Sequence, residues 1–412
     1  MFVLTPPPSK SLTNRAIILA ALTNGKTIIE NYSECDDTNY LTKALKKLGV
    51  SIIKNKHTLI INGTGGKFKK SNLTIYSGNA GTTLRFLTAL SILIKGKITL
   101  TGSKRMLKRP IGELVDAIKQ LGIDIKSNNG FPPVKVQGGK IKTNSIVISS
   151  EKSSQFISAL LLILPAINEK IKITVKGKIP SIPYLKLTLD VLEKFGVKIH
   201  HINFRQFYLD ETLQIKPTKI IIESDASSAT YFLGAAAILK KEIEVIGINK
   251  NSKQADVKFI HVLEQMGCEI KWKENSIILK GKTLRGIEID MNDAPDSVPT
   301  LAVVSLFAKG KTKITNIANL KFKESDRIEV LRKELSKLGA EVKAGNDFIE
   351  VEPKKTYKIT RINSHNDHRI AMSFAMASIK LPGLQITNPN CIKKSFPNFW
   401  SEFNKMKLLY KL

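Results

Sequence analysis

Residues 44–52 read ALKKLGVSI, and four later segments of the chain repeat this pattern. Each segment combines the end of an amphipathic helix, a glycine and the start of a β-strand. We expect the glycine to take left-handed backbone angles after the last helical turn, because a residue without Cβ adopts them at little cost. The later copies read AIKQLGIDI at Gly122, VLEKFGVKI at Gly196, VLEQMGCEI at Gly267 and ELSKLGAEV at Gly339.

These glycines lie at almost equal intervals along the chain. The successive steps are 73, 74, 71 and 72 residues. Such a period is longer than that of common solenoid repeats and favours compact βα repeats gathered into lobes. The C-terminus has no sixth copy, so we expect the N-terminal strand, around residues 2–4, to complete one repeat.

A second pattern alternates with the first. A start rich in small and polar residues opens an apolar helix, which a Gly/Lys turn and a β-branched strand then follow. Ser, Thr, Asp and Asn are the residues that an N-cap requires. The six copies read SKSLTNRAIILAAL, NAGTTLRFLTAL, KSSQFISALLLI, DASSATYFLGAAAI, APDSVPTLAVVSLF and NDHRIAMSFAMA.

Six repeats divide into three plus three, and this division predicts an α/β protein with two lobes. The chain is then expected to cross between the lobes twice, near residues 8–10 and just before Asp225. Residues 1–9 and 225–412 would form one lobe, which both chain termini complete. Residues 10–224 would form an inserted lobe of three repeats.

The composition is that of a soluble globular protein, with 42% hydrophobic and 24% charged residues in 412. The formal net charge of +30 favours a lysine-rich surface, and the alternative is nucleic-acid binding. No zinc-finger spacing, RNP-like segment or basic tail supports that alternative. Three well-separated cysteines and no long apolar run predict reduced thiols, a cytoplasmic location and no membrane association. We expect a monomer without a specific nucleic-acid partner.

Arginine is scarce, since only ten of the 65 basic residues are Arg. A rigid guanidinium fork grips a carboxylate or phosphate with two parallel bonds, which lysine cannot do. Six arginines in short, strongly patterned segments therefore predict a pocket for a small molecule that carries several negative charges. They are Arg15, Arg85, Arg105, Arg109, Arg327 and Arg369.

The starts of the apolar helices carry many of the remaining candidates. A helix start offers free N–H donors and a partial positive charge, so several converging starts would bind an anion. Gly81 would let an anion approach the backbone closely. Ser227 and Ser228 are interpreted as helix caps, and Asp367 as a cap or a brace for an arginine. The candidates at these starts are Lys10, Ser11, Arg15, Asn79, Gly81, Thr82, Arg85, Ser153, Ser154, Gln155, Asp296, His368 and Arg369.

Nine motifs together resemble the 5-enolpyruvylshikimate-3-phosphate synthases, which are 3-phosphoshikimate 1-carboxyvinyltransferases, over essentially the whole chain. In order they are PSKSLTNRA, GNAGTTLR, RMLKRPIG, SSQF, SIPY, DASSA, KESDR, NDHR and KKSFP. The resemblance implies two lobes of three βαβαββ repeats each, an inverse α/β barrel, with the active site in the cleft between the lobes. It also implies transfer of the enolpyruvyl group of phosphoenolpyruvate to shikimate 3-phosphate, without a metal or cofactor.

The resemblance assigns site residues by position. The implied shikimate 3-phosphate ligands are Lys10, Ser11, Arg15, Ser153, Ser154, Gln155, Ser181, Tyr184, Asp296, Asn319 and Lys323. The implied phosphoenolpyruvate ligands are Lys10, Asn79, Gly81, Thr82, Arg109, Gln155, Arg327, His368, Arg369 and Lys394. The implied catalytic residues are Asp296 as the base for the 5-hydroxyl, Glu324 as the acid and base at the donor carbon, and Lys10 as a charge stabiliser.

Two alternatives remain open on the sequence. UDP-N-acetylglucosamine enolpyruvyl transferases share the implied fold and donor, but they usually carry a reactive Cys in the loop that here reads GSKRMLKRP. An RNA-end-modifying protein on a related repeat would account for the basic charge. The resemblance further implies competition between glyphosate and phosphoenolpyruvate, with Phe86 behind the glycine loop as the position that could alter it.

Overall fold

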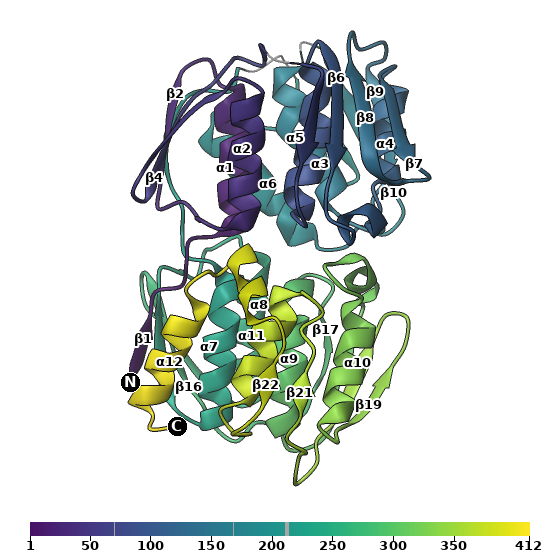
Figure 1. The fold of residues 1–412 in the computed structure, drawn as a ribbon. Coiled ribbons are helices and arrows are strands. Elements are labelled where there is room, and N and C mark those ends of the chain that lie inside the picture. Colours follow the sequence, from purple (N-terminus) through teal and green to yellow (C-terminus); the bar gives the residue numbers. More distant parts are fainter. Residues whose placement is uncertain (70, 168, 211–213) are drawn as a thin grey trace. The chain divides into compact units, whose positions relative to one another are not determined.

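The computed structural model describes residues 1–69, 71–167, 169–210 and 214–412 (Figure 1). The chain divides into two compact units by its contacts. The discontinuous unit comprises Met1–Pro7 and Glu223–Leu412, and the continuous unit comprises Pro8–Ile222. Both crossings lie two residues before the boundaries expected from the sequence. In the part of the chain that the model describes, no helix has the length and apolar character to cross a membrane.

The continuous unit contains three four-stranded sheets, in which one outer pair of strands is parallel and the other pairs are antiparallel. The sheet orders are β13-β2-β4-β3, β5-β6-β8-β7 and β11-β12-β10-β9. The strands are β2 Lys26–Glu30, β3 Ser51–Asn55, β4 Thr58–Asn62, β5 Leu73–Tyr76, β6 Gly96–Thr101, β7 Asp124–Asn128, β8 Phe131–Gly138, β9 Ser145–Ser149, β10 Lys172–Lys176, β11 His200–Ile202, β12 Gln206–Tyr208 and β13 Lys219–Ile221.

The discontinuous unit repeats this arrangement twice and then shortens it. Its sheet orders are β1-β14-β16-β15, β17-β18-β20-β19 and β21-β22. The strands are β1 Phe2–Leu4, β14 Glu242–Ile246, β15 Glu269–Trp272, β16 Ser276–Lys280, β17 Glu288–Asp290, β18 Thr312–Thr315, β19 Glu341–Ala344, β20 Ile349–Glu352, β21 Arg361–Ile362 and β22 Gln385–Ile386. The last repeat, which has no copy of the glycine pattern, lacks the antiparallel strand pair.

Helices connect the strands of every repeat. The α-helices are α1 Lys10–Leu22, α2 Asp36–Lys47, α3 Gly81–Leu90, α4 Gly112–Gln120, α5 Gln155–Ile163, α6 Ile182–Lys194, α7 Ala226–Leu239, α8 Lys258–Gln265, α9 Val298–Val304, α10 Arg327–Lys337, α11 His368–Ala377 and α12 Phe399–Leu409. The short 3₁₀ turns are η1 Ser91–Leu93, η2 Met106–Lys108, η3 Leu164–Ala166, η4 Ala255–Val257, η5 Pro295–Ser297, η6 Ser305–Phe307, η7 Ala318–Phe322 and η8 Pro389–Lys394.

The glycines of the repeated pattern have the backbone angles that the sequence predicts. Their φ values are +95° at Gly49, +78° at Gly122, +78° at Gly196, +111° at Gly267 and +94° at Gly339. Each glycine follows an amphipathic helix and precedes a strand, as expected for a left-handed residue that ends a helix. This prediction is confirmed.

Strands β1 and β13 are exchanged between the two units. In the sheet of β5 and β6, the strand before the helix lies parallel to the strand after it. β1 precedes α1 but pairs with β14, and β13 precedes α7 but pairs with β2. Each therefore completes a sheet of the unit that the chain is about to leave. Residues 2–4 do complete a repeat, but it is the repeat of Gly267 and not the one without a glycine copy.

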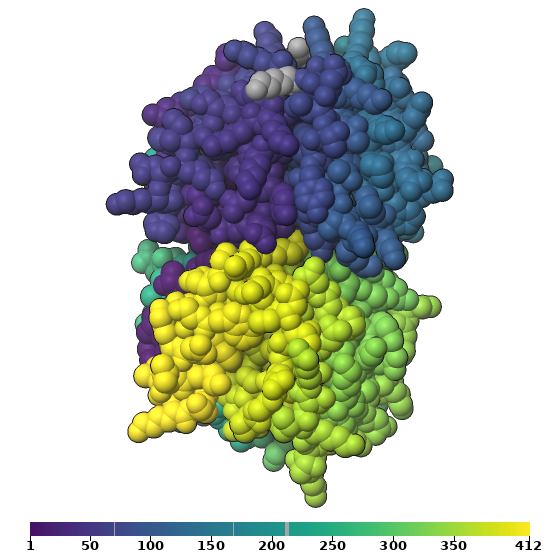
Figure 2. All heavy atoms as spheres, in the orientation of Figure 1, coloured from purple at the N-terminus to yellow at the C-terminus, as the bar shows by residue number. Residues whose placement is uncertain are grey.

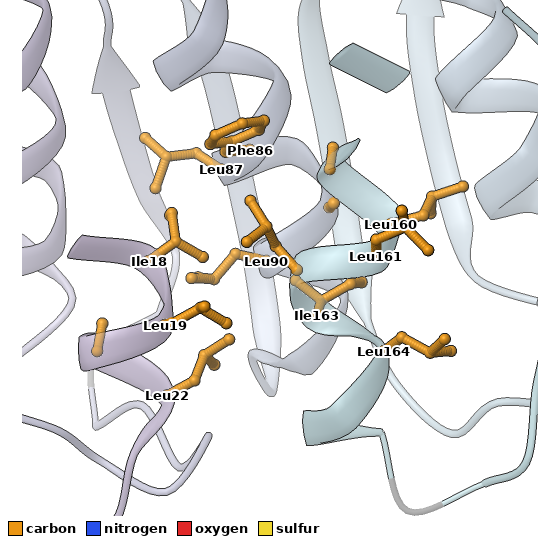
Figure 3. Close-up of a cluster of buried hydrophobic side chains, with 14 of the residues drawn as sticks. Ile18, Leu19, Leu22, Phe86, Leu87, Leu90, Leu160, Leu161, Ile163 and Leu164 are labelled. Carbon is orange, nitrogen blue, oxygen red and sulfur yellow. The ribbon is translucent and has the colours of Figure 1, made fainter. Parts of the chain in front are cut away.

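Apolar helices form the centre of each unit. In the continuous unit, side chains of α1, α3 and α5, among them Ile18, Phe86 and Leu160, pack against one another (Figure 3). Nearly every residue of α1 from Leu12 onward is buried, because the helix is apolar around its whole circumference. Helices α7, α9 and α11 have the same character in the discontinuous unit.

Helix α12 covers part of the discontinuous unit, where the last residues of the chain are exposed in yellow in Figure 2. The ring centroids of Phe403 and Phe399, both in this helix, lie 6.3 Å and 5.6 Å from the ring centroid of Phe232. Beyond the helix, the hydroxyl of Tyr410 accepts a hydrogen bond from the Phe2 backbone N–H at 3.2 Å and donates one to the Glu242 carbonyl. The C-terminal segment thus fastens β1 to β14.

Candidate active site

Aspartate side chains cap the starts of three helices in the described structure. Asp225, Asp326 and Asp367 each accept a backbone N–H from the first turn of α7, α10 and α11. The sequence suggested that Ser227 and Ser228 cap α7. This prediction is wrong, because Asp225 accepts the Ser228 N–H at 2.7 Å. Ser9 and Ser154 occupy N-cap positions without a side-chain capping bond.

Arg327, at the start of α10, is fully buried and binds three carboxylates. Its Nε lies 2.8 Å and its Nη2 3.2 Å from the two carboxylate oxygens of Asp367, which is the bidentate geometry of a guanidinium fork. Nη1 donates to Asp296 at 2.9 Å and Nη2 to Glu324 at 2.8 Å. Burial alone would lower the pKa of Arg327, but the three carboxylates raise it above its usual value. The arginine is permanently charged and rigidly held.

Asp296, in η5, lies among three cations. Its Oδ1 is 3.4 Å from Lys323 Nζ and 2.9 Å from Arg327 Nη1, and its Oδ2 is 2.8 Å from Arg369 Nη2. Burial raises the pKa of Asp296, but Arg369, Lys323 and Arg327 outweigh burial and hold that pKa well below its usual range. The carboxylate is therefore a weak base as long as these cations surround it.

Glu324 connects Arg327 with the C-terminal part of the chain. It lies just before α10, its side chain is nearly buried, and its Oε1 is 3.4 Å from Nζ of Lys394 in η8. The two carboxylate oxygens therefore contact two different cations, Arg327 and Lys394. An anionic ligand that attracted either cation would change the charge environment of Glu324.

The sequence predicted that Asp367 is a helix cap or a brace for an arginine, and in the structure it is both. It accepts the backbone N–H of Arg369 at 3.0 Å while it holds Arg327. His368 is 1% exposed, and its Nδ1 lies 3.6 Å from Asp367 Oδ1. Arg369 Nη1 donates to the hydroxyl of Tyr231 at 3.3 Å. Burial raises the pKa of Tyr231 to about 12, so this hydroxyl is a neutral partner at physiological pH.

Lys10 and Arg15 project from α1 in the continuous unit. Lys10 Nζ lies 3.0 Å from Oδ2 of Asp37, a buried residue of α2. Arg15 is 1% exposed and donates to neutral oxygens, namely Thr188 Oγ1 at 2.8 Å and the carbonyls of Ser11 at 2.9 Å and Tyr184 at 3.2 Å. Burial lowers the pKa of Arg15 to about 10, which shows how much desolvation this cation carries.

Arg85 joins α3 to the start of α5. Its Nη1 donates to Gln155 Oε1 at 2.6 Å and lies 3.4 Å from Ser153 Oγ, and its guanidinium carbon is 5.0 Å from the ring centroid of Phe156. The arginine thus fixes the orientation of the Gln155 amide. Phe86, the neighbouring residue, is buried beneath Arg15, whose guanidinium carbon lies 5.5 Å from its ring centroid.

Arg109 lies against the glycine loop before α3. Its Nη1 donates to the carbonyl of Asn79 at 3.3 Å. A Cβ added to Gly81 would lie 2.6 Å from the same Nη1 and 2.7 Å from the guanidinium carbon. Glycine at position 81 therefore makes room for the guanidinium of Arg109. Thr82 follows in the first turn of α3 and is partly exposed.

The sequence-derived candidates are divided between the two units of the chain. The continuous unit holds Lys10, Ser11, Arg15, Asn79, Gly81, Thr82, Arg109, Ser153, Ser154, Gln155, Ser181 and Tyr184. The discontinuous unit holds Asp296, Asn319, Lys323, Glu324, Arg327, His368, Arg369 and Lys394. Ser181 stands at the N-cap of α6 with a left-handed φ of +58°, and Asn319 lies buried in η7.

Sequence reasoning missed two buried carboxylates that lie beside these cations. Asp37 contacts Lys10, and Asp256 lies buried near Arg369 and Asp296. In a chain with 65 basic and 35 acidic residues, a carboxylate close to an apolar helix start is an unusual feature and could have been noted. The pairings themselves depend on tertiary structure and leave no local pattern.

Comparison with known proteins identifies the family of the chain. Residues 3–403 match the family model of EPSP synthase (3-phosphoshikimate 1-carboxyvinyltransferase). A 3-phosphoshikimate 1-carboxyvinyltransferase of Pseudoalteromonas translucida is 43% identical over 96% of this chain and 95% of its own length. One from Buchnera aphidicola is 44% identical over 96% and 93%.

Solved structures show the same fold. The EPSP synthase of Acinetobacter baumannii has a TM-score of 0.80 at 28% identity and covers 98% of this chain and 95% of its own. The enolpyruvyl transferase NikO of Streptomyces tendae shares the fold, with a TM-score of 0.76 at 15% identity over 98% and 94% of the two chains. On the family match and these relatives, the chain belongs to the EPSP synthase (3-phosphoshikimate 1-carboxyvinyltransferase) family.

Proposed function

We propose that this enzyme transfers the enolpyruvyl group of phosphoenolpyruvate to the 5-hydroxyl of shikimate 3-phosphate and releases phosphate. The reaction belongs to the shikimate pathway of aromatic amino-acid biosynthesis. The observation that carries the proposal is the family match over residues 3–403, and the relatives favour this acceptor over a UDP-sugar. The chemistry requires sites for two ligands that each carry a phosphate and a carboxylate.

Residues of the continuous unit would bind most of shikimate 3-phosphate. Arg15 supports this assignment, because it is a buried cation whose acceptors are neutral oxygens. A carboxylate or phosphate beside it would offset the cost of burial and restore its pKa. The remaining proposed ligands are Lys10, Ser11, Ser153, Ser154, Gln155, Ser181 and Tyr184, together with Asp296, Asn319 and Lys323.

Phosphoenolpyruvate would take the place of carboxylates that now hold the cations. Arg327, Arg369 and Lys394 each contact a carboxylate of the protein. An incoming phosphate or carboxylate offers the same oxygen geometry, so the cations need only change partner and need not be ordered anew. The other proposed donor ligands are Lys10, Asn79, Gly81, Thr82, Arg109, Gln155 and His368.

This exchange of partners would activate the base. Asp296 removes the proton of the 5-hydroxyl as that oxygen attacks C2 of phosphoenolpyruvate, while Glu324 donates a proton to C3. Cations that turn toward the substrates leave Asp296, and its pKa then rises toward a value suited to a general base. Lys10 stabilises the charge of the tetrahedral intermediate.

The intermediate then collapses. The C2–O bond to phosphate breaks, and phosphate leaves with the proton that Asp296 took from the 5-hydroxyl. Glu324 takes back a proton from the methyl group to form the enol ether. Each proton is moved by a side chain of this protein, so the proposed reaction needs no metal or organic cofactor. We further propose that the enzyme acts in the cytoplasm as a monomer, with small anionic substrates as its partners and no specific nucleic acid.

A phosphate-release assay tests the function. Purified protein should release phosphate from phosphoenolpyruvate when shikimate 3-phosphate is present, and not with UDP-N-acetylglucosamine as the acceptor. Turnover with the UDP-sugar alone would reject the assignment. A gel-shift series in rising salt tests the RNA alternative, because binding that rests on surface charge alone is lost at moderate salt.

A further inference from the structure

A buried carboxylate that the proposed mechanism does not use lies next to the candidate base. Asp256, in η4, is 3% exposed. Its Oδ1 accepts a short hydrogen bond from the Ser297 hydroxyl, and its Oδ2 accepts one from the Ser227 hydroxyl. Two serines from different elements therefore meet at a single carboxylate.

These serines tie two important segments together. Ser297 directly follows Asp296, and both belong to η5, the turn Pro295–Ser297. Ser227 lies in the first turn of α7. Through Asp256, the turn that carries the candidate base is thus fixed to the start of a central helix.

The segment around Asp256 is itself anchored to the same helix start. Gln254, two residues earlier, accepts the backbone N–H of Ala226 at 3.1 Å and donates to the carbonyl of Ser224 at 2.7 Å. Both contacts are buried, and together they leave the segment little freedom to shift against α7. Asp256 is therefore a rigid reference point for η5.

Asp256 lies near one cation and one carboxylate of the candidate site. Burial raises the pKa of Asp256 above its usual value, Arg369 offsets part of this rise, and the nearby Asp296 adds to it. The two serine hydroxyls satisfy both oxygens of Asp256, whereas Arg369 gives its own hydrogen bonds to Asp296 and Tyr231. Arg369 thus supplies positive charge near Asp256 while its direct contact remains with the candidate base.

We propose that Asp256 is a positioning residue, which holds the turn of Asp296 through Ser297 and thereby aims the base at the 5-hydroxyl of the acceptor. This inference rests on the proposed function. Asp256 itself touches neither substrate, so its loss should impair the chemical step and leave ligand binding nearly intact. A displacement of the base by about 1 Å is enough to slow an enzyme strongly.

The experiment compares three single variants, one double variant and a control variant with the wild type in steady-state kinetics. Asp256→Ala and Ser297→Ala should each lower kcat about tenfold or more, with KM for both substrates changed less than about threefold. Asp256→Asn should stay within about threefold of wild-type kcat, because an amide accepts from one serine and donates to the other. The double variant of Asp256→Ala with Ser297→Ala should be no slower than the slower single variant, because both changes break one link.

Several outcomes would overturn the inference. These are unchanged kcat in Asp256→Ala or Ser297→Ala, an effect confined to KM, and an additive loss in the double variant. Equal loss in Asp256→Asn and Asp256→Ala would also overturn it, since charge and not position would then matter. Asp116→Asn, at an exposed carboxylate that pairs with Lys119 on α4, is the control and should behave as the wild type.

Two features keep the test decisive. If Asp256→Ala does not fold, the smaller change Ser297→Ala and the conservative Asp256→Asn still give the two opposite results that the inference requires. Absence of wild-type turnover with shikimate 3-phosphate would reject the proposed function. Wild-type turnover with unaffected variants would reject the role of Asp256 alone.

Discussion

Replacing Arg327 with lysine should weaken both the stability of the discontinuous unit and the activity. The guanidinium makes four charge-assisted hydrogen bonds, at 2.8 and 3.2 Å to Asp367, 2.9 Å to Asp296 and 2.8 Å to Glu324. A single ammonium nitrogen keeps the charge but cannot reproduce the fork on Asp367 and still reach the other two carboxylates.

The magnitude follows from the contacts that lysine must lose. Loss of at least two of the four bonds, at about 1.5 kcal/mol or more each, lowers the free energy of unfolding by roughly 3 kcal/mol or more. Because Arg327 also orients Asp296 and Glu324, kcat/KM should fall about tenfold or more, equivalent to about 1.4 kcal/mol of transition-state stabilisation.

Arg332→Lys is a matched control within the same helix. Arg332 makes a similar fork on Glu329, at 2.6 and 2.8 Å, but both side chains are about half exposed (44% and 56%). An exposed pair contributes little to stability because water and salt screen it, so the control should change little in denaturant unfolding and in steady-state kinetics. Equal effects at both positions would refute the reasoning, because total charge and not buried geometry would then be decisive.

Three further predictions concern ligands and pH. Glyphosate should compete with phosphoenolpyruvate, and Gly81→Ala should weaken both ligands because its Cβ displaces Arg109; inhibition that is independent of the donor concentration would contradict this. Since the folded-state pKa of Asp296 is depressed, its contribution to stability is present at neutral pH and is lost as the pH falls through about 4 and below. Urea unfolding of wild type and Asp296→Asn should therefore converge as the pH falls from about 5 towards 2, and a constant difference would argue against it. Shikimate 3-phosphate should protect backbone amides from hydrogen exchange in both units, because the proposed ligands come from both; protection confined to one unit would count against this ligand set.

The repeat could be predicted from the sequence because its signals are local. A glycine that ends a helix and an alternating strand leave marks within about ten residues, so the positions of Gly49 and its counterparts were enough to give the repeat. The pairing of β13 could not be predicted, because three residues, Lys219–Ile221, bind a strand almost 200 positions earlier. The sequence of such a short strand does not identify the strand with which it pairs.

The candidate site shows the same division. Arg327 and Arg369 stood out because arginine is scarce, and Asp367 because it begins a helix. Asp37 and Asp256 could not be predicted as site residues, because their partners, a lysine and a serine, are brought beside them only by folding. The prediction that Ser227 and Ser228 cap α7 failed for a related reason, because a nearby aspartate accepts the backbone N–H instead.

The exchange of β1 and β13 sets the order in which a ribosome can complete this protein. Phe2 is made 241 positions before its partner Ile243, an interval of roughly 10 to 50 s at about 5–20 residues per second. The continuous unit needs no such wait, because β13 emerges within it and closes its last sheet before α7 is made. Translation should therefore yield a finished inner unit while the first three-residue strand is still unpaired. A protein fused to the N-terminus would therefore be attached to the discontinuous unit, which is the unit completed last.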